Sequence, residues 1–367
     1  RLFQEAGSST PTAGNSVSRE LANPNIKPEL YEEYEVGFEA RALDNRISLD
    51  FSYYERNTQD LIIDRPLAPT TGFTSTQFNV GEIEGYGFES TLGVSVIQND
   101  GTGFNWDINI NYTKTRSKVT DLGLEPTEDP VDNAIPYSGF SDLGNAAIEG
   151  FAFSTMIGSS VQRDDEGNPL VNDQGQYVED PGPNIIGDAT PDFLTNFNTT
   201  LSYRNFTFNA LISYKQGGDI YSNTIATMLG RGVTTDTDDR LDTYILPGIS
   251  QSTGEPNDVQ INNSTYYFSV FGIGAPDELK VYDGTVVRLQ EVSLAYKLPK
   301  KLLESTPFGS VSLTVKGNNL FYDAPNTPDG VNFDPNIVGT GVGNGRGFDF
   351  LNGPSGKRYG FTIRATF

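Results

Sequence analysis

The chain has 367 residues, with 25 Lys and Arg against 48 Asp and Glu, so its formal net charge at pH 7 is −23. Because a chain with this negative charge repels other anions, nucleic acid and anionic lipid headgroups are disfavoured as primary partners. Because Cys and His are both absent, disulfides, thiolate chemistry, Cys/His zinc sites and His-dependent catalytic triads are excluded.

The first 30 residues are polar and open without an initiator Met, a charged leader or an apolar run of about 18 residues. We therefore expect no signal peptide and no transmembrane helix. We interpret residues 1–30 as a loop entered midway, and the chain as a piece of a longer protein.

Strict alternation of apolar and polar residues begins near residue 31 and predicts β-strands. Tyr34, Val36 and Phe38 alternate with Glu35 and Glu39, and the turn residues Asp44 and Asn45 separate this segment from a second one. The expected strands are 31–43, 47–63, 80–97, 104–119, 192–204, 206–216, 285–298, 311–322 and 357–367. This count of nine predicts an all-β protein with one apolar and one polar face.

Short and long connections alternate along the chain. The long ones are 64–79, 120–191, 217–284 and 323–356, and we expect 120–191 to be a single excursion that carries its own β-hairpin. Outer-membrane barrels have short periplasmic turns and long extracellular loops. If 357–367 runs toward the periplasm, the four long connections and residues 1–30 are extracellular.

The strand ends carry aromatic residues, as the interfacial girdles of such barrels do. They include Tyr34, Tyr53, Tyr54, Phe104, Tyr112, Tyr203, Tyr214, Tyr296 and Tyr359. The last strand ends on an aromatic residue and presents one apolar face, which is typical of a barrel assembly signal. The residues of this expected signal are Tyr359, Phe361, Ile363, Ala365 and Phe367.

Residues 23–62, NPNIKPELYEEYEVGFEARALDNRISLDFSYYERNTQDLI, resemble the C-terminal barrel of SusC/RagA-type TonB-dependent transporters of the Bacteroidota. Three later stretches agree in order: IGDATPDFLTNFNTTLSYRNFTFNALISYKQGGDIYSNT, DGTVVRLQEVSLAYKLPKKLL and VKGNNLFY. The resemblance implies a 22-stranded antiparallel transmembrane barrel, of which this chain supplies the last nine strands. The resemblance also implies a plug domain, which we do not find in this sequence.

The same resemblance implies import of glycan fragments or peptides across the outer membrane of a Gram-negative bacterium, without enzymatic chemistry. The implied partners are a SusD-like surface lipoprotein, outer-membrane lipids, and TonB–ExbB–ExbD acting through the absent N-terminal part. A structural subunit of a larger outer-membrane assembly is an alternative, and a soluble or surface-anchored β-rich adhesin is a third reading.

Aromatic residues in the long connections are the best candidates for binding a ligand or a partner: Tyr221, Tyr266, Tyr267 and Phe268. Tyr rings stack on sugars or pack on proteins, but packing of one loop on another explains them equally well. The residues expected to line the lumen are Glu35, Glu39, Asp50, Asp107 and Asn109.

The acidic loops match a calcium-binding loop only in part, because no Glu stands at the bidentate position. We expect no metal site and no cofactor, and we keep calcium in 163–180 as an alternative. The Pro- and Gly-rich connection 323–356 is either a mobile hinge or a docking loop.

Overall fold

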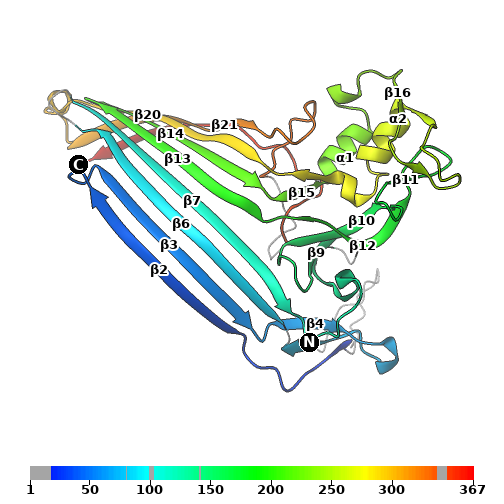
Figure 1. Ribbon diagram of the computed structural model, residues 1–367. Helices are drawn as coiled ribbons and strands as arrows, with labels where there is room; N and C mark the ends of the chain where they lie inside the picture. The colour runs from blue at the N-terminus through cyan, green and yellow to red at the C-terminus, as the bar shows by residue number, and fades with distance from the viewer. Residues whose placement is uncertain (1–17, 80, 99–102, 140–141, 337–344) are drawn as a thin grey trace, which may run out of the picture.

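A nine-stranded antiparallel sheet forms most of the protein (Figure 1). The computed structural model describes residues 18–79, 81–98, 103–139, 142–336 and 345–367. In the order in which they lie side by side, the strands are β2 (Leu30–Ala42), β3 (Ile47–Gln59), β6 (Glu82–Ile97), β7 (Phe104–Asp121), β13 (Pro191–Tyr203), β14 (Phe206–Gly217), β20 (Val286–Lys297), β21 (Ser310–Asp323) and β23 (Arg358–Thr366). The nine strands expected from the alternation are therefore confirmed within the described residues.

The strands are long, from 9 residues in β23 to 18 in β7, whereas strands in soluble proteins average about 5–6. Consecutive strands pair throughout, and β2 and β23 form the two edges. The short connections and the C-terminus lie at one end of the sheet, and the four long connections lie at the other (Figure 1).

The tight turns contain residues at positive φ. Asp44 and Asn45, with φ values of 54° and 64°, are types that tolerate this region, whereas Leu43 at 53° and Arg204 at 51° adopt it at a cost in strain. Such values fit primed hairpin turns, whose twist matches that of the flanking strands.

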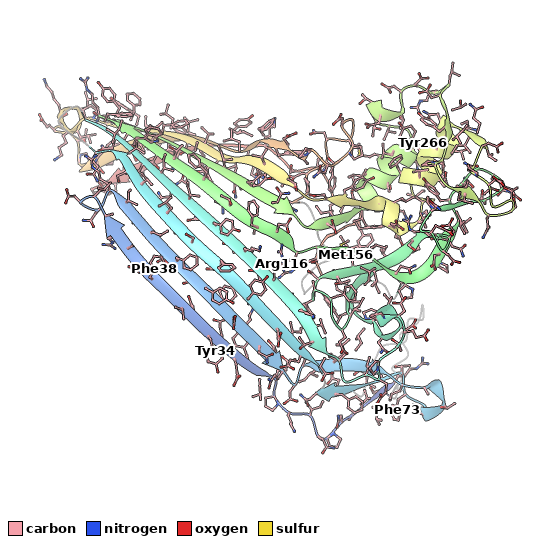
Figure 2. The ribbon with its side chains drawn as sticks, in the orientation of Figure 1. Tyr34, Phe38, Phe73, Arg116, Met156 and Tyr266 are labelled. Atoms are coloured by element: carbon pink, nitrogen blue, oxygen red, sulfur yellow. The ribbon has the colours of Figure 1, made fainter. Side chains whose placement is uncertain are left out.

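The inter-strand register places the apolar residues of all nine strands on one face. On that face Phe38 lies opposite Phe51, and their ring centroids are 5.6 Å apart. Tyr34 and Val36 are each 74% exposed, and Phe361 is 63% exposed, so this face has no protein cover within the described chain. Side chains of Tyr34 and Phe38 follow one another along β2 (Figure 2).

One girdle assignment was wrong. Tyr54 is paired with Glu35 on β2 and with Gly87 on β6, which places it on the polar face. Tyr53 precedes it and lies on the apolar face opposite Val36 and Phe88. Adjacent residues of a strand point to opposite faces, so Tyr53 and Tyr54 cannot both belong to one girdle.

The connection between β7 and β13 forms its own four-stranded sheet, in the order β12, β10, β9, β8. The strands are β8 (Ile135–Gly139), β9 (Gly144–Ala147), β10 (Thr155–Val161) and β12 (Glu179–Asp188). A turn at residues 148–154 separates β9 from β10. The long connection is thus more elaborate than the single hairpin expected, and it stays outside the nine-stranded sheet.

Short elements complete the long connections. They are β1 (Glu20–Leu21), β4 (Ile62–Pro66), β5 (Ser75–Asn79), β11 (Leu170–Val171), β15 (Asp219–Ser222), α1 (Asn223–Gly230), β16 (Thr243–Ile245), β17 (Ile249–Ser250), β18 (Gln260–Asn262), α2 (Asn263–Tyr266), β19 (Val281–Asp283) and β22 (Phe348–Asp349). A π-helical turn, Tyr267–Phe271, continues α2. Among the described residues no helix has the length and apolar character needed to cross a membrane.

The hydrophobic core lies in these connections and at the strand ends beside them. One cluster contains Ile220, Ile225 and Leu229 together with Val331 and Phe333. Since two different connections contribute to this cluster, they form one packed assembly next to the end of the sheet.

Candidate functional site: the polar face and the loops beside it

The polar face carries the residues predicted to line a lumen. Glu39 lies directly opposite Asp50, and Asp107 accepts a hydrogen bond of 2.6 Å from the Ser95 hydroxyl. Two carboxylates opposite each other are tolerated only where water screens their repulsion. The register therefore favours a hydrated surface on this side.

Tyr221 is 4% exposed and packs with Met156 and Phe348 in a core cluster. Burial raises the pKa of its hydroxyl above the ordinary value. The Lys280 ammonium lies 5.7 Å from the ring centroid. The Tyr221 ring is thus in contact with other parts of the protein, so it packs one loop on another and is not exposed to a ligand.

Tyr266 and Tyr267 also pack within the loop assembly. Tyr266 stacks on Tyr244 with ring centroids 3.8 Å apart, and Tyr267 donates a hydrogen bond of 2.5 Å to the Asp236 carbonyl. Phe268 is 44% exposed, and its ring covers Gly274. Tyr221 lies in a different cluster from Tyr266, so the four predicted aromatics do not form one site.

The connection 323–356 is fixed to its neighbours at two places. Asp334 forms a buried ion pair with Arg288 of β20, and their side chains are 1% and 6% exposed. Asp349 accepts hydrogen bonds from the Ser222 hydroxyl at 2.8 Å and the Thr224 amide at 3.1 Å, at the N-terminus of α1. These anchors oppose the hinge interpretation for the two anchored parts; residues 337–344 of this connection lie outside the described range.

The acidic loop considered for calcium uses its leading carboxylate internally. Asp164 accepts hydrogen bonds from the Asn168 side chain and from the amides of Asn168 and Glu166. The Asn168 side chain, followed by the backbone amides, lowers the pKa of Asp164. Within the described chain no three acidic side chains form a group suited to a metal ion.

A cavity of about 520 Å³ opens where the polar face meets the connection between β7 and β13. Its sheet wall includes Tyr54 and Arg56 of β3, and Tyr54 Oη lies 3.0 Å from Thr115 Oγ1 of β7. The Tyr54 side chain lies over Gly87 of β6, and the Arg56 side chain lies over Gly85. A Cβ atom on Gly87 would be 2.3 Å from the Tyr54 ring, and one on Gly85 would be 3.1 Å from Arg56 Nε.

The opposite wall comes from the loops. Tyr137 and Phe153 stack with centroids 4.5 Å apart, and the Tyr137 hydroxyl donates to the Phe153 carbonyl. Arg346 also lines the cavity, and its backbone amide donates to Asn145 Oδ1 at 2.8 Å. Residues separated by nearly 300 positions thus meet at one site.

Sequence reasoning missed this cavity. The signal that could have indicated it is the pair Gly85 and Gly87, two glycines in period two inside a long strand. Glycine in a strand interior often marks a close approach by another group. The partner of each glycine depends on the register between β3 and β6.

The family described as "TonB dependent receptor-like, beta-barrel" matches residues 2–320. TonB-dependent receptor P3 of Formosa agariphila is 30% identical over 338 residues, an alignment that covers 86% of this chain and 32% of the relative. TonB-dependent receptor SusC of Bacteroides thetaiotaomicron is 27% identical over 205 residues, which are 53% of this chain and 20% of the relative.

The fold is similar to that in the structure of the RagAB peptide transporter, with a TM-score of 0.65 and 20% identity over 100% of this chain and 38% of that one. The chain spans about a third of the length of the curated relatives that match most of it. With most of its residues matched by the family pattern, the chain belongs to the TonB-dependent receptor-like β-barrel family.

Proposed function

We propose that this chain is part of a TonB-dependent transporter that imports a polar oligomer, a glycan fragment or a peptide, across the outer membrane of a Gram-negative bacterium. The observation that carries the proposal is the two-faced sheet of nine long strands with all long connections at one end. An exposed apolar face next to a polar one is what a lipid-embedded barrel wall requires.

The proposal includes closure into a 22-stranded barrel. Both edge strands, β2 and β23, present unpaired backbone groups on one side within the described chain. Such groups are too costly to leave unpaired in a bilayer, so further strands must pair with these edges. The long connections would then be extracellular and would cover the mouth of the lumen.

The names of the relatives support the proposed partner proteins. SusC and RagAB point to a SusD-like lipoprotein as the partner beside the extracellular loops. TonB–ExbB–ExbD would act on a plug supplied by another part of the protein, in keeping with the receptor family. The role of Phe367 and its strand as an assembly signal also belongs to the proposal, as does any contact of Phe268 with a partner.

The test starts from the full-length receptor, affinity-purified from outer membranes in detergent, with its partners identified by mass spectrometry. A co-purified lipoprotein, and nutrient uptake that is lost in a strain without TonB, would support import. Several unrelated subunits together with unchanged uptake in that strain would favour a structural role in an assembly instead.

A further inference from the structure

A cluster of positive charge lies at the end of the sheet where the short connections and the C-terminus lie (Figure 1). Its members are Arg204, in the turn between β13 and β14, and Lys300 and Lys301, in the connection between β20 and β21. The proposed barrel places this end in the periplasm, next to the inner leaflet of the outer membrane. We propose that these three residues, here called the headgroup patch, bind the phosphate headgroups of anionic phospholipids in that leaflet.

The net charge of −23 disfavours anionic lipids for the chain as a whole, but this charge is unevenly distributed. The connection 122–190, at the opposite end of the sheet, has 13 acidic residues and one basic residue, Arg163. The connection 298–309 has two lysines and one acidic residue, Glu304. Asp100, in the turn before β7, lies outside the described residues. Because salt screens charges beyond about 10 Å, the local excess of positive charge decides which headgroups this end attracts.

The Arg204 side chain lies on the apolar side of the sheet. Its guanidinium carbon is 5.1 Å from the centroid of the Tyr203 ring. Tyr203 is 45% exposed and pairs with Phe206, whose ring centroid is 4.7 Å from that of Tyr296. These three rings belong to the apolar face, where aromatic girdles mark the boundary between hydrocarbon and headgroups. A guanidinium beside this girdle therefore lies at the depth of the lipid phosphates.

The backbone of Arg204 also points to a function for its side chain. Its φ of 51° lies in a region that Asn or Gly adopts more easily than Arg does. The turn is nevertheless fixed, because the Arg204 amide donates to the Gly103 carbonyl at 3.0 Å. Residues in strained conformations concentrate at functional sites, and lipid contact gives this arginine such a function.

Lys300 and Lys301 belong to a short turn that is fixed by its own hydrogen bonds. The Leu303 amide donates to the Lys300 carbonyl at 2.8 Å, and the Thr306 amide donates to the Leu303 carbonyl at 2.9 Å. The Leu303 side chain is 7% exposed and anchors the turn, whereas the Leu302 side chain is 62% exposed. An exposed leucine beside two lysines fits a membrane interface, where the leucine enters the hydrocarbon and the ammonium groups stay with the phosphates.

The two connections form one patch. The Asn205 side-chain amide donates to the Lys297 carbonyl at 2.7 Å, and the Lys297 amide donates to the Asn205 carbonyl at 2.9 Å. None of the three cations of the headgroup patch takes part in the four ion pairs of the described chain. Lys297 and Arg364, both opposite Ser312 on the polar face, add positive charge at this end. Arginine and lysine bind phosphate through charge-assisted hydrogen bonds, which are stronger than neutral ones.

The inference rests on the proposed barrel for the position of the patch in the membrane, and its test measures lipid binding without transport. The full-length receptor is reconstituted in phosphatidylcholine nanodiscs with increasing fractions of phosphatidylglycerol that carries a photoreactive group near its phosphate. After illumination, mass spectrometry measures the yield of cross-links to residues 298–309, and photoreactive phosphatidylcholine gives the yield for a headgroup without net charge. Excess inorganic phosphate distinguishes a lipid site from a site for the free anion.

Wild type is compared with Arg204→Gln, with the double variant Lys300→Gln and Lys301→Gln, and with the control Lys118→Gln. Lys118 lies on the apolar face of β7, opposite Glu84 and at the other end of the sheet, so its substitution also removes a lipid-facing cation. Circular dichroism confirms the folding of each variant.

We expect phosphatidylglycerol to be cross-linked in preference to phosphatidylcholine. Its apparent affinity should fall about fivefold for each cation removed from the patch, should not change in Lys118→Gln, and should persist in excess inorganic phosphate. The inference is overturned if the two lipids cross-link equally, if both patch variants behave as wild type does, if Lys118→Gln loses as much affinity, or if phosphate displaces the lipid. A receptor that stays soluble without detergent would refute the barrel and the patch together, whereas lipid selectivity without TonB-dependent uptake would refute the import proposal alone.

Discussion

The buried ion pair between Arg288 and Asp334 should hold the connection 323–356 against the end of the sheet, and Asp334→Ala tests this. The substitution leaves the Arg288 guanidinium buried without its carboxylate, and breaking a buried pair in this way costs about 3–5 kcal/mol. It also removes the acceptor of the Asn336 amide, which lies 3.1 Å from Asp334 Oδ1. Val331 and Phe333, which bury their side chains on the neighbouring loop, would be released with it.

A cost of about 3–5 kcal/mol raises the local opening equilibrium by about 10² to 10³-fold or more. Amide hydrogen exchange of residues 331–336, measured on the full-length receptor in detergent, should accelerate by that factor in Asp334→Ala. The double variant Arg288→Met with Asp334→Leu should recover most of the protection, because an apolar pair can replace a buried ion pair.

The pair between Arg163 and Glu278 is the matched control. The Arg163 side chain is 43% exposed, so Arg163→Gln should cost at most about 1 kcal/mol and leave exchange at 331–336 unchanged. Equal exchange in wild type and Asp334→Ala would refute the assignment of the buried pair as the anchor. So would equal acceleration in Arg163→Gln.

Three further outcomes are expected. Gly87→Ala places a Cβ 2.3 Å from the Tyr54 ring and should lower the free energy of unfolding in lipid by about 1–3 kcal/mol in denaturant titrations; an unchanged midpoint would contradict the packing described. Phe361→Arg puts a charge on the apolar face and should cost about 2–4 kcal/mol in the same titration, whereas Thr362→Arg on the polar face should cost much less; equal costs would contradict the two-faced assignment. Burial raises the pKa of the Asp219 carboxyl, so the folded state binds the carboxyl proton more tightly than the unfolded state does. The folded state is therefore most stable below the unfolded pKa of this group, and it loses that stability as the pH rises through the raised pKa. The protection factor of the Tyr221 amide in β15, which donates to the Gly347 carbonyl at 2.8 Å, should therefore rise as the pH is lowered toward that pKa once the intrinsic pH dependence of exchange is removed. This rise should be absent in Asp219→Asn.

The sequence alone determined the barrel wall. Alternation with period two determines which side chains share a face of the sheet. Few folds accommodate nine long strands with a single apolar face, and a membrane barrel is one of them. The turn residues Asp44 and Asn45 and the segregation of short from long connections could be read in the same way, because they depend on near neighbours in the chain.

The arrangement of the long connections was decided by tertiary structure. Tyr221 looks like a surface aromatic in the sequence, yet it is buried because Phe348, over a hundred residues away, packs on it. Tyr54 looks like its neighbour Tyr53 and lies on the opposite face. Arg56 and Arg346 come together only through the strand register and the docking of a distant loop, since no local pattern encodes which segments meet. Local periodicity therefore determines the faces of the wall, and long-range packing determines what stands beside its polar face.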